Sequence, residues 1–345
     1  VDGVLGNGSY GHVLDAVDGA LAWQSYCKMV PLETIPHVNT PRMVTTGWHY
    51  AYLKIAEGCD LHCTYCIIPK LRGNFRSVPM EHLLREAKQL ADDGVKEIIL
   101  VAQETTLYGK DLYGEKKLPE LLRRLCKISG IRWIRILYCY PEEITEELIQ
   151  TIKEEPKICH YLDLPIQHAS DDVLKRMGRR TSKEELIHII SRIREEIPDI
   201  TLRTTLITGF PGESKEQHEE LMDFVDEMAF DRLGVFTYSA EDGTPAAQMP
   251  DQVEESVKEA RRAELMELQQ EIAFDQAEQM IGREVLVMIE GKVADENAYV
   301  GRTYKDAPNV DGLIFVNTDT ELLSGDFAKV RVTGACEYDL IGELM

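Results

Sequence analysis

Three cysteines lie close together near the start of the chain, at the spacing C-x3-C-x2-C. They are Cys59, Cys63 and Cys66, and no fourth cysteine lies nearby in the sequence. Iron-sulfur cubes are usually held by four cysteine thiolates, so a loop with three leaves one iron for a ligand that is not protein. A metal with an open position does chemistry, whereas one with every position filled is usually structural. The spacing therefore predicts a [4Fe-4S] cluster with one reactive iron.

Two other roles are open to these cysteines. A structural zinc ion would need a fourth Cys or His close by, and His62 lies inside the loop. Unligated buried cysteines are common in general, but three of them so close together are unusual. For the scattered cysteines we expect packing in the core, and these are Cys27, Cys126, Cys139, Cys159 and Cys336.

The elements that must position the loop follow from an alternation of apolar runs and amphipathic stretches. It predicts strands over 50–56, 97–102, 131–137, 161–164, 201–208 and 232–237. It predicts helices between them over 79–93, 118–127, 145–155, 183–197 and 215–228. Two helices begin with a capping box, Ser182 with Glu185 and Ser214 with Gln217.

Strands that alternate with helices of this length predict an α/β fold with a parallel sheet and helices outside it. Six units make a partial (β/α)6 TIM-like barrel. In such barrels the chemistry gathers at the C-terminal ends of the strands. The cysteine loop obeys this rule, because it begins directly after the strand over 50–56.

Further candidate residues follow other strands at the same end of the barrel. Gln103 and Glu104 follow the second strand, and Gln167 and Ser170 follow the fourth. Arg179 or Arg180 could meet a carboxylate with a planar fork, or could end a solvated helix. The turn Thr-Gly-Phe-Pro-Gly-Glu over 208–213 follows the fifth strand, where glycines let the backbone approach a ligand closely.

The chain changes character towards its C-terminus. A long polar helix is predicted over 253–280, leading out of the barrel, with Lys258, Arg261, Arg262 and Glu264 at exposed positions. Beyond it, short strands are predicted over 284–290, 298–302, 313–316, 327–333 and 339–343. Five short strands with turns between them indicate a small all-β barrel of the oligonucleotide-binding type.

The first 48 residues show little regular pattern apart from a short helix predicted over 12–21. A glycine-rich start is expected to be irregular, and Pro31, Pro36 and Pro41 interrupt the stretch that follows. We therefore expect a connector over 1–48, a core domain over 49–281 and a small barrel domain over 282–345.

The net charge of the chain indicates which classes of partner it could bind. Against 38 Lys and Arg the chain has 60 Asp and Glu, a net charge of −22. Such a chain repels nucleic acid on average, and a basic protein partner fits it better. No run is long enough for a membrane span and no secretory leader opens the chain, so we expect a cytoplasmic protein without a membrane partner.

Several motifs resemble the radical S-adenosylmethionine (SAM) methylthiotransferase family, from about residue 45 to the C-terminus. The residues that carry the resemblance are the runs 52–73, 161–168, 203–213, 235–239 and 243–246. The resemblance implies that SAM chelates the open iron through its amino and carboxylate groups. One electron from the cluster then breaks a C–S bond of SAM, and the resulting 5′-deoxyadenosyl radical abstracts hydrogen from an unactivated carbon.

The resemblance also implies which residues contact SAM, with Glu104 as a candidate for its ammonium. The expected contacts are Tyr65, Gln103, Glu104, Gln167, Ser170, Arg180, Arg203, Gly209, Phe210 and Pro211. It names the small C-terminal barrel as a TRAM domain.

Within this family one branch modifies the β-carbon of an aspartate in the twelfth protein of the small ribosomal subunit, and another modifies a tRNA adenosine. From Met280 to Met345 the chain has 12 acidic and 6 basic residues, a net charge of −6. A module that grips RNA should be basic and rich in exposed aromatics. The protein-modifying branch is therefore expected, with the basic ribosomal protein as substrate, a flavodoxin-type reductase as electron donor and no direct tRNA binding. A non-catalytic iron-sulfur or zinc interaction protein remains the alternative from another class.

Relatives have a further N-terminal domain whose three cysteines bind a second cluster. Upstream of Tyr50 this chain has only Cys27. We therefore expect one cluster in this chain and the second only in a longer protein.

Overall fold

Six parallel strands form the main sheet of the protein, in a computed structural model that describes residues 1–33 and 42–345. Their order is β10-β9-β8-β7-β6-β3, and β10 and β3 are the two edges, so the barrel stays open between them. The strands are β3 (Tyr50–Lys54), β6 (Glu97–Val101), β7 (Trp133–Ile136), β8 (Ile158–Asp163), β9 (Thr201–Thr208) and β10 (Arg232–Thr237). The predicted partial barrel is confirmed.

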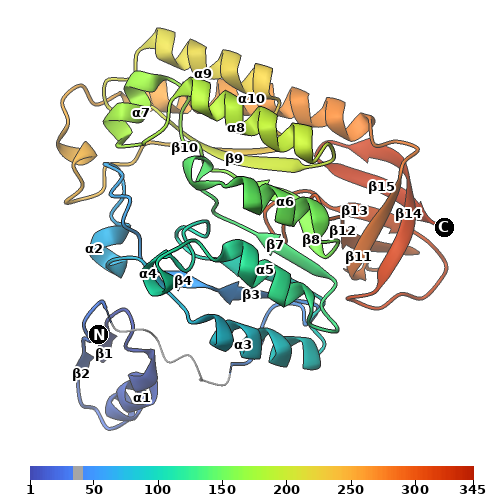
Figure 1. Ribbon diagram of the computed structural model, residues 1–345, viewed down its shortest axis with the longest axis horizontal. Helices are drawn as coiled ribbons and strands as arrows, with labels where there is room; N and C mark the ends of the chain where they lie inside the picture. Colours follow the sequence, from blue (N-terminus) through green and yellow to red (C-terminus); the bar gives the residue numbers. More distant parts are fainter. Residues whose placement is uncertain (34–41) are drawn as a thin grey trace.

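Amphipathic helices cover the outside of this sheet (Figure 1). On α3, Leu83, Ala87 and Leu90 are buried at helical spacing, so one stripe faces the sheet. Both predicted capping boxes are present. The outer helices are α3 (Met80–Asp92), α5 (Leu118–Cys126), α6 (Glu146–Glu154), α8 (Lys183–Glu196) and α9 (Lys215–Met228). Across the described residues, the model contains no helix with the length and apolar character that a membrane crossing requires.

Several short helices and strands lie at the end of the barrel where the C-terminal ends of the parallel strands meet. They escaped prediction because a few residues are too short to show a hydrophobic period. They are β4 (Ala56–Glu57), β5 (Arg76–Ser77), α2 (Ile68–Arg72), α4 (Lys110–Tyr113) and α7 (Asp171–Met177), with 3-10 turns at Tyr10–His12, Pro141–Glu143 and Ala246–Gln248.

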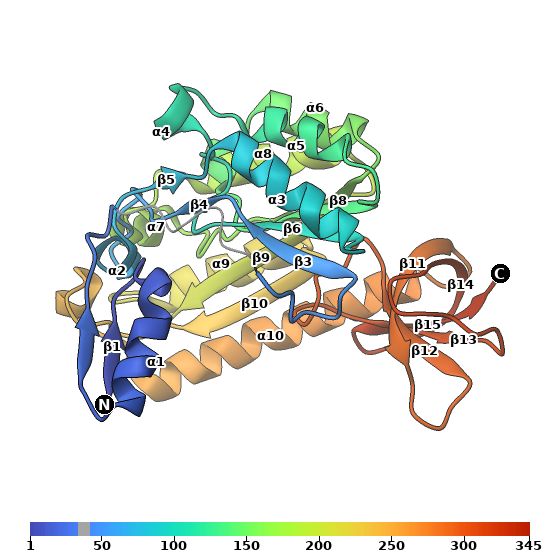
Figure 2. The same ribbon diagram turned by 90° about the horizontal axis from the view of Figure 1, so that it is seen from below.

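The long helix α10 (Glu255–Glu278) runs along β10 and α9 towards the C-terminal barrel (Figure 2). Arg262 and Glu264 are exposed as predicted. The prediction is wrong for Lys258 and Arg261, which are buried. Both cations have polar partners in the core, since Arg261 pairs with Glu213 in the loop after β9 and Lys258 donates to the Tyr238 carbonyl just after β10.

The C-terminal residues form a closed barrel in the order β11-β12-β13-β15-β14, which confirms the predicted small β-barrel. Inward-facing Val287, Ile289, Ile314 and Val316 fill its core. Its strands are β11 (Glu284–Lys292), β12 (Ala298–Arg302), β13 (Ile314–Asn317), β14 (Phe327–Cys336) and β15 (Asp339–Leu344).

The N-terminal residues are more regular than expected. The predicted helix is present as α1 (Val13–Leu21), but β1 (Gly3–Leu5) and β2 (Tyr26–Lys28) flank it and pair in parallel, so the irregular start was wrong. Three-residue strands are too short for a sequence pattern to reveal. The part of the predicted 1–48 connector over residues 34–41 lies outside the described residues.

The scattered cysteines divide into two groups. Cys126, Cys139 and Cys159 are buried as predicted. Cys27 and Cys336 are exposed, so the expected core packing is wrong for these two. Cys27 is the middle residue of the short strand β2, and Cys336 is the last residue of β14, where the chain turns into β15.

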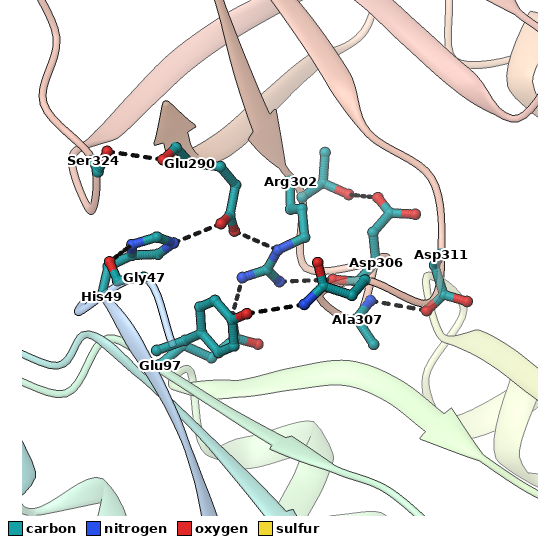
Figure 3. A network of polar contacts seen from close by, with 12 residues as sticks. Gly47, His49, Glu97, Glu290, Arg302, Asp306, Ala307, Asp311 and Ser324 are labelled. Atoms are coloured by element: carbon teal, nitrogen blue, oxygen red, sulfur yellow. Dashed lines mark hydrogen bonds and ion pairs between the residues drawn. The ribbon is translucent and has the colours of Figure 1, made fainter. Parts of the chain in front are cut away.

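A buried network of charges joins the C-terminal barrel to the floor of the large barrel (Figure 3). Arg302 on β12 donates to Glu97 on β6 at 2.8 Å and to Glu290 at 2.5 Å. Arg135 on β7 donates to the other oxygen of Glu97 at 2.7 Å. His49 contacts Glu290 at 2.6 Å. The two domains are thus fixed to each other by Glu97, Arg135 and Arg302, which have almost no exposure to solvent, with Glu290 at the partly exposed side of the network.

Candidate functional site

The three cysteines lie in the loop that follows β4, at the end of the barrel opposite the small β-barrel (Figure 1). Cys59 and Cys63 are buried and Cys66 is half-buried. Gly58 precedes them with φ +81°, and a Cβ there would lie 2.2 Å from the carbonyl oxygen of Asn74. Only glycine fits this turn, which brings the loop back over the strand ends.

Backbone hydrogen bonds hold the loop on both sides. The Cys59 N–H donates to the Gly73 carbonyl at 3.2 Å, and the Thr64 N–H donates to the Met177 carbonyl at 2.9 Å. The second bond connects the loop to α7, on the far side of the barrel mouth. The thiols are therefore presented on a fixed frame.

The donor set fits a cluster better than a single ion. Within the described ranges, no three His, Cys, Asp or Glu side chains converge closely enough to hold one metal ion. A tetrahedral zinc site needs such convergence, whereas each thiolate of a cluster binds its own iron. His62, the residue on which a zinc site would depend, is exposed.

Burial raises the pKa of the Cys59 thiol to about 11 and also raises the pKa of Cys66. At neutral pH both thiols are protonated and poor nucleophiles. A bound metal would stabilise their thiolate forms. This environment suits metal ligands and not a nucleophilic cysteine.

A cavity of about 490 Å³ opens beside the loop. Its polar side chains come from the ends of β3, β6 and β7, as expected for a barrel of this type. The lining residues are Lys54, Cys59, Cys66, Ile68, Val101, Ala102, Gln103, Tyr138 and Tyr140. The vacant side of a cluster and a ligand of SAM size would share this space.

Of the predicted contact residues, Gln103 lines this cavity, and its amide oxygen accepts from the Gly58 N–H at 2.8 Å. Glu104 lies behind the wall with no exposure to solvent. Burial raises the pKa of Glu104 to about 8, and its Oε2 has no hydrogen-bond partner among the described residues. Tyr65 packs in a small apolar cluster next to the loop.

The other predicted contacts lie outside the cavity wall. Gln167 adopts a left-handed φ of +71°, and Ser170 is buried at the start of α7. Arg180 is exposed, whereas its neighbour Arg179 is buried. Arg203 lies deeper in the barrel, where it pairs with Asp163 at 2.8 Å.

Three residues that the sequence did not single out lie at this site, Tyr138, Tyr140 and Glu142, and Arg179 of the predicted arginine pair joins them. The Tyr140 hydroxyl lies 3.3 Å from the Cys63 sulfur. The Arg179 guanidinium stacks 4.1 Å over the Tyr140 ring and pairs with Glu142 at 3.2 Å. Tyr138 projects into the cavity. The sequence could have pointed to the two tyrosines through their position, because the run Tyr-Cys-Tyr over 138–140 directly follows the third predicted strand.

The glycine-containing turn after β9 is held by the core. Phe210 is fully buried with its ring 5.3 Å from that of Tyr238, and its N–H donates to Glu213 at 3.0 Å. Arg261 of α10 pairs with Glu213 at 2.9 Å. Lys258 passes under Gly209, where a Cβ would lie 2.3 Å from its side chain. The Phe210 ring is thus a packing residue, and α10 fixes the turn from below.

We expect Arg261→Met to lower the free energy of unfolding by roughly 1–3 kcal/mol, because Glu213 would be left buried without its cation. Burial already raises the pKa of Glu213 against the opposing effect of Arg261, so the carboxyl can neutralise and limit the cost. Urea unfolding measures the change. Arg262→Met, at an exposed position of the same helix, is the matched control and should change stability little. Equal losses in the two variants would contradict the buried pair.

A second cavity, of about 400 Å³, lies between β10, α10 and the C-terminal barrel. It is lined by Arg203, Asp231, Arg232 and Asp311 among others, but by no cysteine. Its charged side chains already pair with one another or with backbone groups. The cavity beside the cysteines is therefore the candidate site.

Two protein families match separate parts of the chain. Residues 53–225 match the model of the radical SAM superfamily, and residues 281–345 match that of the TRAM domain. A ribosomal protein uS12 methylthiotransferase RimO from Lachnoclostridium phytofermentans is 62% identical over 342 residues, which cover 99% of this chain and 78% of the relative. The relative of the same name from Desulfitobacterium hafniense is 47% identical over 348 residues, covering 100% and 78%.

Among solved structures, the radical SAM methyltransferase TsrM from Kitasatospora setae, with cobalamin and a [4Fe-4S] cluster bound, has a TM-score of 0.48 and 16% identity. The similar region covers 57% of this chain and 38% of that one.

Proposed function

Since the chain belongs to the uS12 methylthiotransferase family of radical SAM proteins, we propose that it adds a methylthio group to the β-carbon of an aspartate in this ribosomal protein. One observation carries the proposal: the three-cysteine loop forms a wall of the cavity of about 490 Å³. A cluster needs an open iron and space beside it for such chemistry, and this site offers three thiols and that space.

We propose that Cys59, Cys63 and Cys66 hold a [4Fe-4S] cluster. When bound, the cluster supplies the electron that cleaves SAM. The chain contributes the frame, since Gly58 turns the loop and the hydrogen bonds from Cys59 and Thr64 fix it beside the cavity.

Gln103 is the SAM contact that the geometry supports best, and Glu104, buried behind it, remains a proposed contact for the ammonium. Gln103 lines the cavity. Its side-chain oxygen accepts from the Gly58 N–H, which orients the amide and leaves its NH2 group to donate to a ligand. The unpaired oxygen of Glu104 is an acceptor for an ammonium. Gln167, Ser170, Arg180 and the backbone of the 209–211 turn remain proposed contacts at the rim. Arg203 and the Phe210 ring are better explained as positioning and packing residues.

The surface of the TRAM domain supports a protein substrate over RNA. Two neighbouring turns place four exposed carboxylates together, and the Asn297 side chain bridges the turns by donating to Asp319 at 2.8 Å. Within residues 282–345, all of which the structure describes, no aromatic side chain is exposed for base stacking. We define the acidic corner as Asp295, Glu296, Asp319 and Glu321.

Replacing all four residues of the acidic corner by lysine should lower the association rate with the ribosomal protein about tenfold at low salt, and much less at high salt, because charges of this kind steer encounter. Surface plasmon resonance measures the rate. The matched control replaces four exposed carboxylates of α9 by lysine, which changes net charge equally on another face: Glu216, Asp223, Asp226 and Glu227. Equal losses would mean that net charge alone matters and would contradict a docking role for the corner.

The activity is tested with chain reconstituted with iron and sulfide, then incubated with dithionite and SAM. Release of 5′-deoxyadenosine supports a radical SAM enzyme, and its absence favours the non-catalytic alternative. Adding the ribosomal protein or a tRNA anticodon stem-loop in parallel then identifies the substrate. Hydrogen transfer to 5′-deoxyadenosine from the stem-loop alone would contradict the proposal.

We further propose domain boundaries at 49–281 and 282–345, a flavodoxin-type reductase as the electron donor, and action in the cytoplasm, where the proposed ribosomal substrate is found.

A further inference from the structure

Tyr138 has the most unusual backbone of the residues that line the candidate site. It follows β7 with φ +58°, in the left-handed region that a bulky side chain rarely occupies. Such a conformation costs energy and persists only when its surroundings impose it. Here its N–H donates to Asp163 at 3.0 Å and its carbonyl accepts from the Thr105 N–H at 3.1 Å.

This backbone aims the side chain into the cavity beside the cysteines, where 49% of it stays exposed. Three other polar side chains line the cavity, and each has a partner in the cysteine loop or next to it. Lys54 contacts Glu57, Gln103 accepts from Gly58, and Tyr140 contacts Cys63. No hydrogen bond of the Tyr138 hydroxyl is found among the described residues. It is thus a donor held ready for a ligand.

A chain of polar contacts connects the backbone of Tyr138 to the TRAM domain. Asp163, which is 2% exposed, accepts from Tyr138 through one oxygen and from Arg203 through the other, at 2.8 Å. Arg203 also lies 3.6 Å from Asp311. Asp311 belongs to the loop that closes the barrel floor, where it accepts from the Ala307 N–H (Figure 3). Asp311 is fixed in turn by the Tyr161 hydroxyl at 2.8 Å. The residue expected to contact SAM, Arg203, instead links the two domains to the backbone of Tyr138.

We propose that Tyr138 contacts the substrate, its hydroxyl donating a hydrogen bond to the carboxylate of the aspartate that is modified. Asp163 and Arg203 are positioning residues for it. The inference rests on the proposed function and names the group that orients the substrate. A phenol suits this task because an O–H···O⁻ bond is strong and directional and leaves the neighbouring β-carbon free to face the cofactor.

The test uses reconstituted chain, dithionite, SAM and ribosomal protein carrying deuterium on the β-carbons of its aspartates. The fraction of 5′-deoxyadenosine that carries deuterium reports orientation of the target carbon. Tyr138→Phe keeps the ring and removes only the donor, and should lower this fraction about tenfold, the equivalent of one charge-assisted hydrogen bond. Tyr10→Phe, at a half-exposed tyrosine of the N-terminal unit, is the matched control and should leave the fraction unchanged.

The positioning chain is tested by comparing two changes at Asp163. Asp163→Asn keeps an acceptor for the Tyr138 N–H and should retain most of the deuterium transfer. Asp163→Ala removes the acceptor and should lower transfer as much as Tyr138→Phe. An unchanged fraction in Tyr138→Phe would overturn the contact, and equal losses in the two Asp163 variants would overturn the positioning role. If the wild type cleaves SAM but transfers no deuterium, the proposed function itself fails, and the contact with it.

Discussion

Replacing Cys59 by alanine should reduce iron from about four atoms per chain to near zero and lower the release of 5′-deoxyadenosine roughly a thousandfold or more. The physical reason is that each thiolate holds its own iron, and the described residues contain no group of three or more His, Cys, Asp or Glu side chains that could hold metal in its place. Iron and sulfide analysis of the anaerobically reconstituted variant, followed by a SAM cleavage assay with dithionite, measures both effects.

The matched control is Cys126→Ala, because Cys59 and Cys126 are both 8% exposed. Cys126 packs on α5 against the core, away from the loop. Its replacement should cost some packing energy and leave iron content and SAM cleavage intact. A Cys59→Ala variant that keeps about four iron atoms and cleaves SAM would show that the three-cysteine assignment is wrong.

Replacing Glu97 by glutamine should lower the free energy of unfolding by about 3–5 kcal/mol, because the change leaves two arginines buried without their shared counter-charge. Arg135 and Arg302 approach opposite oxygens of Glu97, and the exposure of all three residues is near zero. Urea unfolding measures the loss. The transition should also broaden or split, since this carboxylate joins the two domains (Figure 3).

Glu81→Gln provides the control for this change. Glu81 also pairs with an arginine, Arg124 at 2.7 Å, but 66% of its side chain is exposed. Exposed pairs contribute little to stability, so this variant should unfold close to the wild type. A Glu97→Gln variant as stable as Glu81→Gln would contradict the role of the buried network.

The network also predicts how the loss depends on pH. Burial alone would raise the pKa of Glu97, but Arg135 and Arg302 hold it below its ordinary value. A carboxyl with a lowered pKa stabilises the fold fully above its ordinary pKa of about 4.3, and that contribution disappears as the pH falls through the lower folded value. The difference between wild type and Glu97→Gln should therefore be constant from neutral pH to about 5 and shrink in stronger acid.

Much of the fold could be predicted because local pattern and tertiary environment agree. The strand β9 was predicted with its observed bounds, since its residues alternate between the helix-covered face and the barrel interior. The starts of α8 and α9 followed from capping boxes, which act within four residues. The cysteine loop could be located at the mouth of the barrel because all parallel strands end at the same side.

The errors arose where a distant partner decides the environment of a residue. Lys258 and Arg261 look like solvated charges on a polar helix, but Glu213 and the Tyr238 carbonyl come to them from the loop and strand that α10 covers. Arg203 was expected to contact SAM from the family resemblance, yet it pairs with Asp163 and Asp311. Such partners are brought together by tertiary packing, and no fixed spacing in the sequence reveals them.

The three-cysteine loop, the open barrel and the acidic TRAM domain were determined by the sequence alone, because spacing, period and charge are properties of neighbouring residues. Only the tertiary structure decided what surrounds the cysteines. Lys54, Gln103 and Tyr138 meet there because three strand ends converge, and Arg302 reaches Glu97 across 205 residues of sequence. Burial then gives these contacts their strength, since a charge or donor removed from water depends on the few partners that the fold provides.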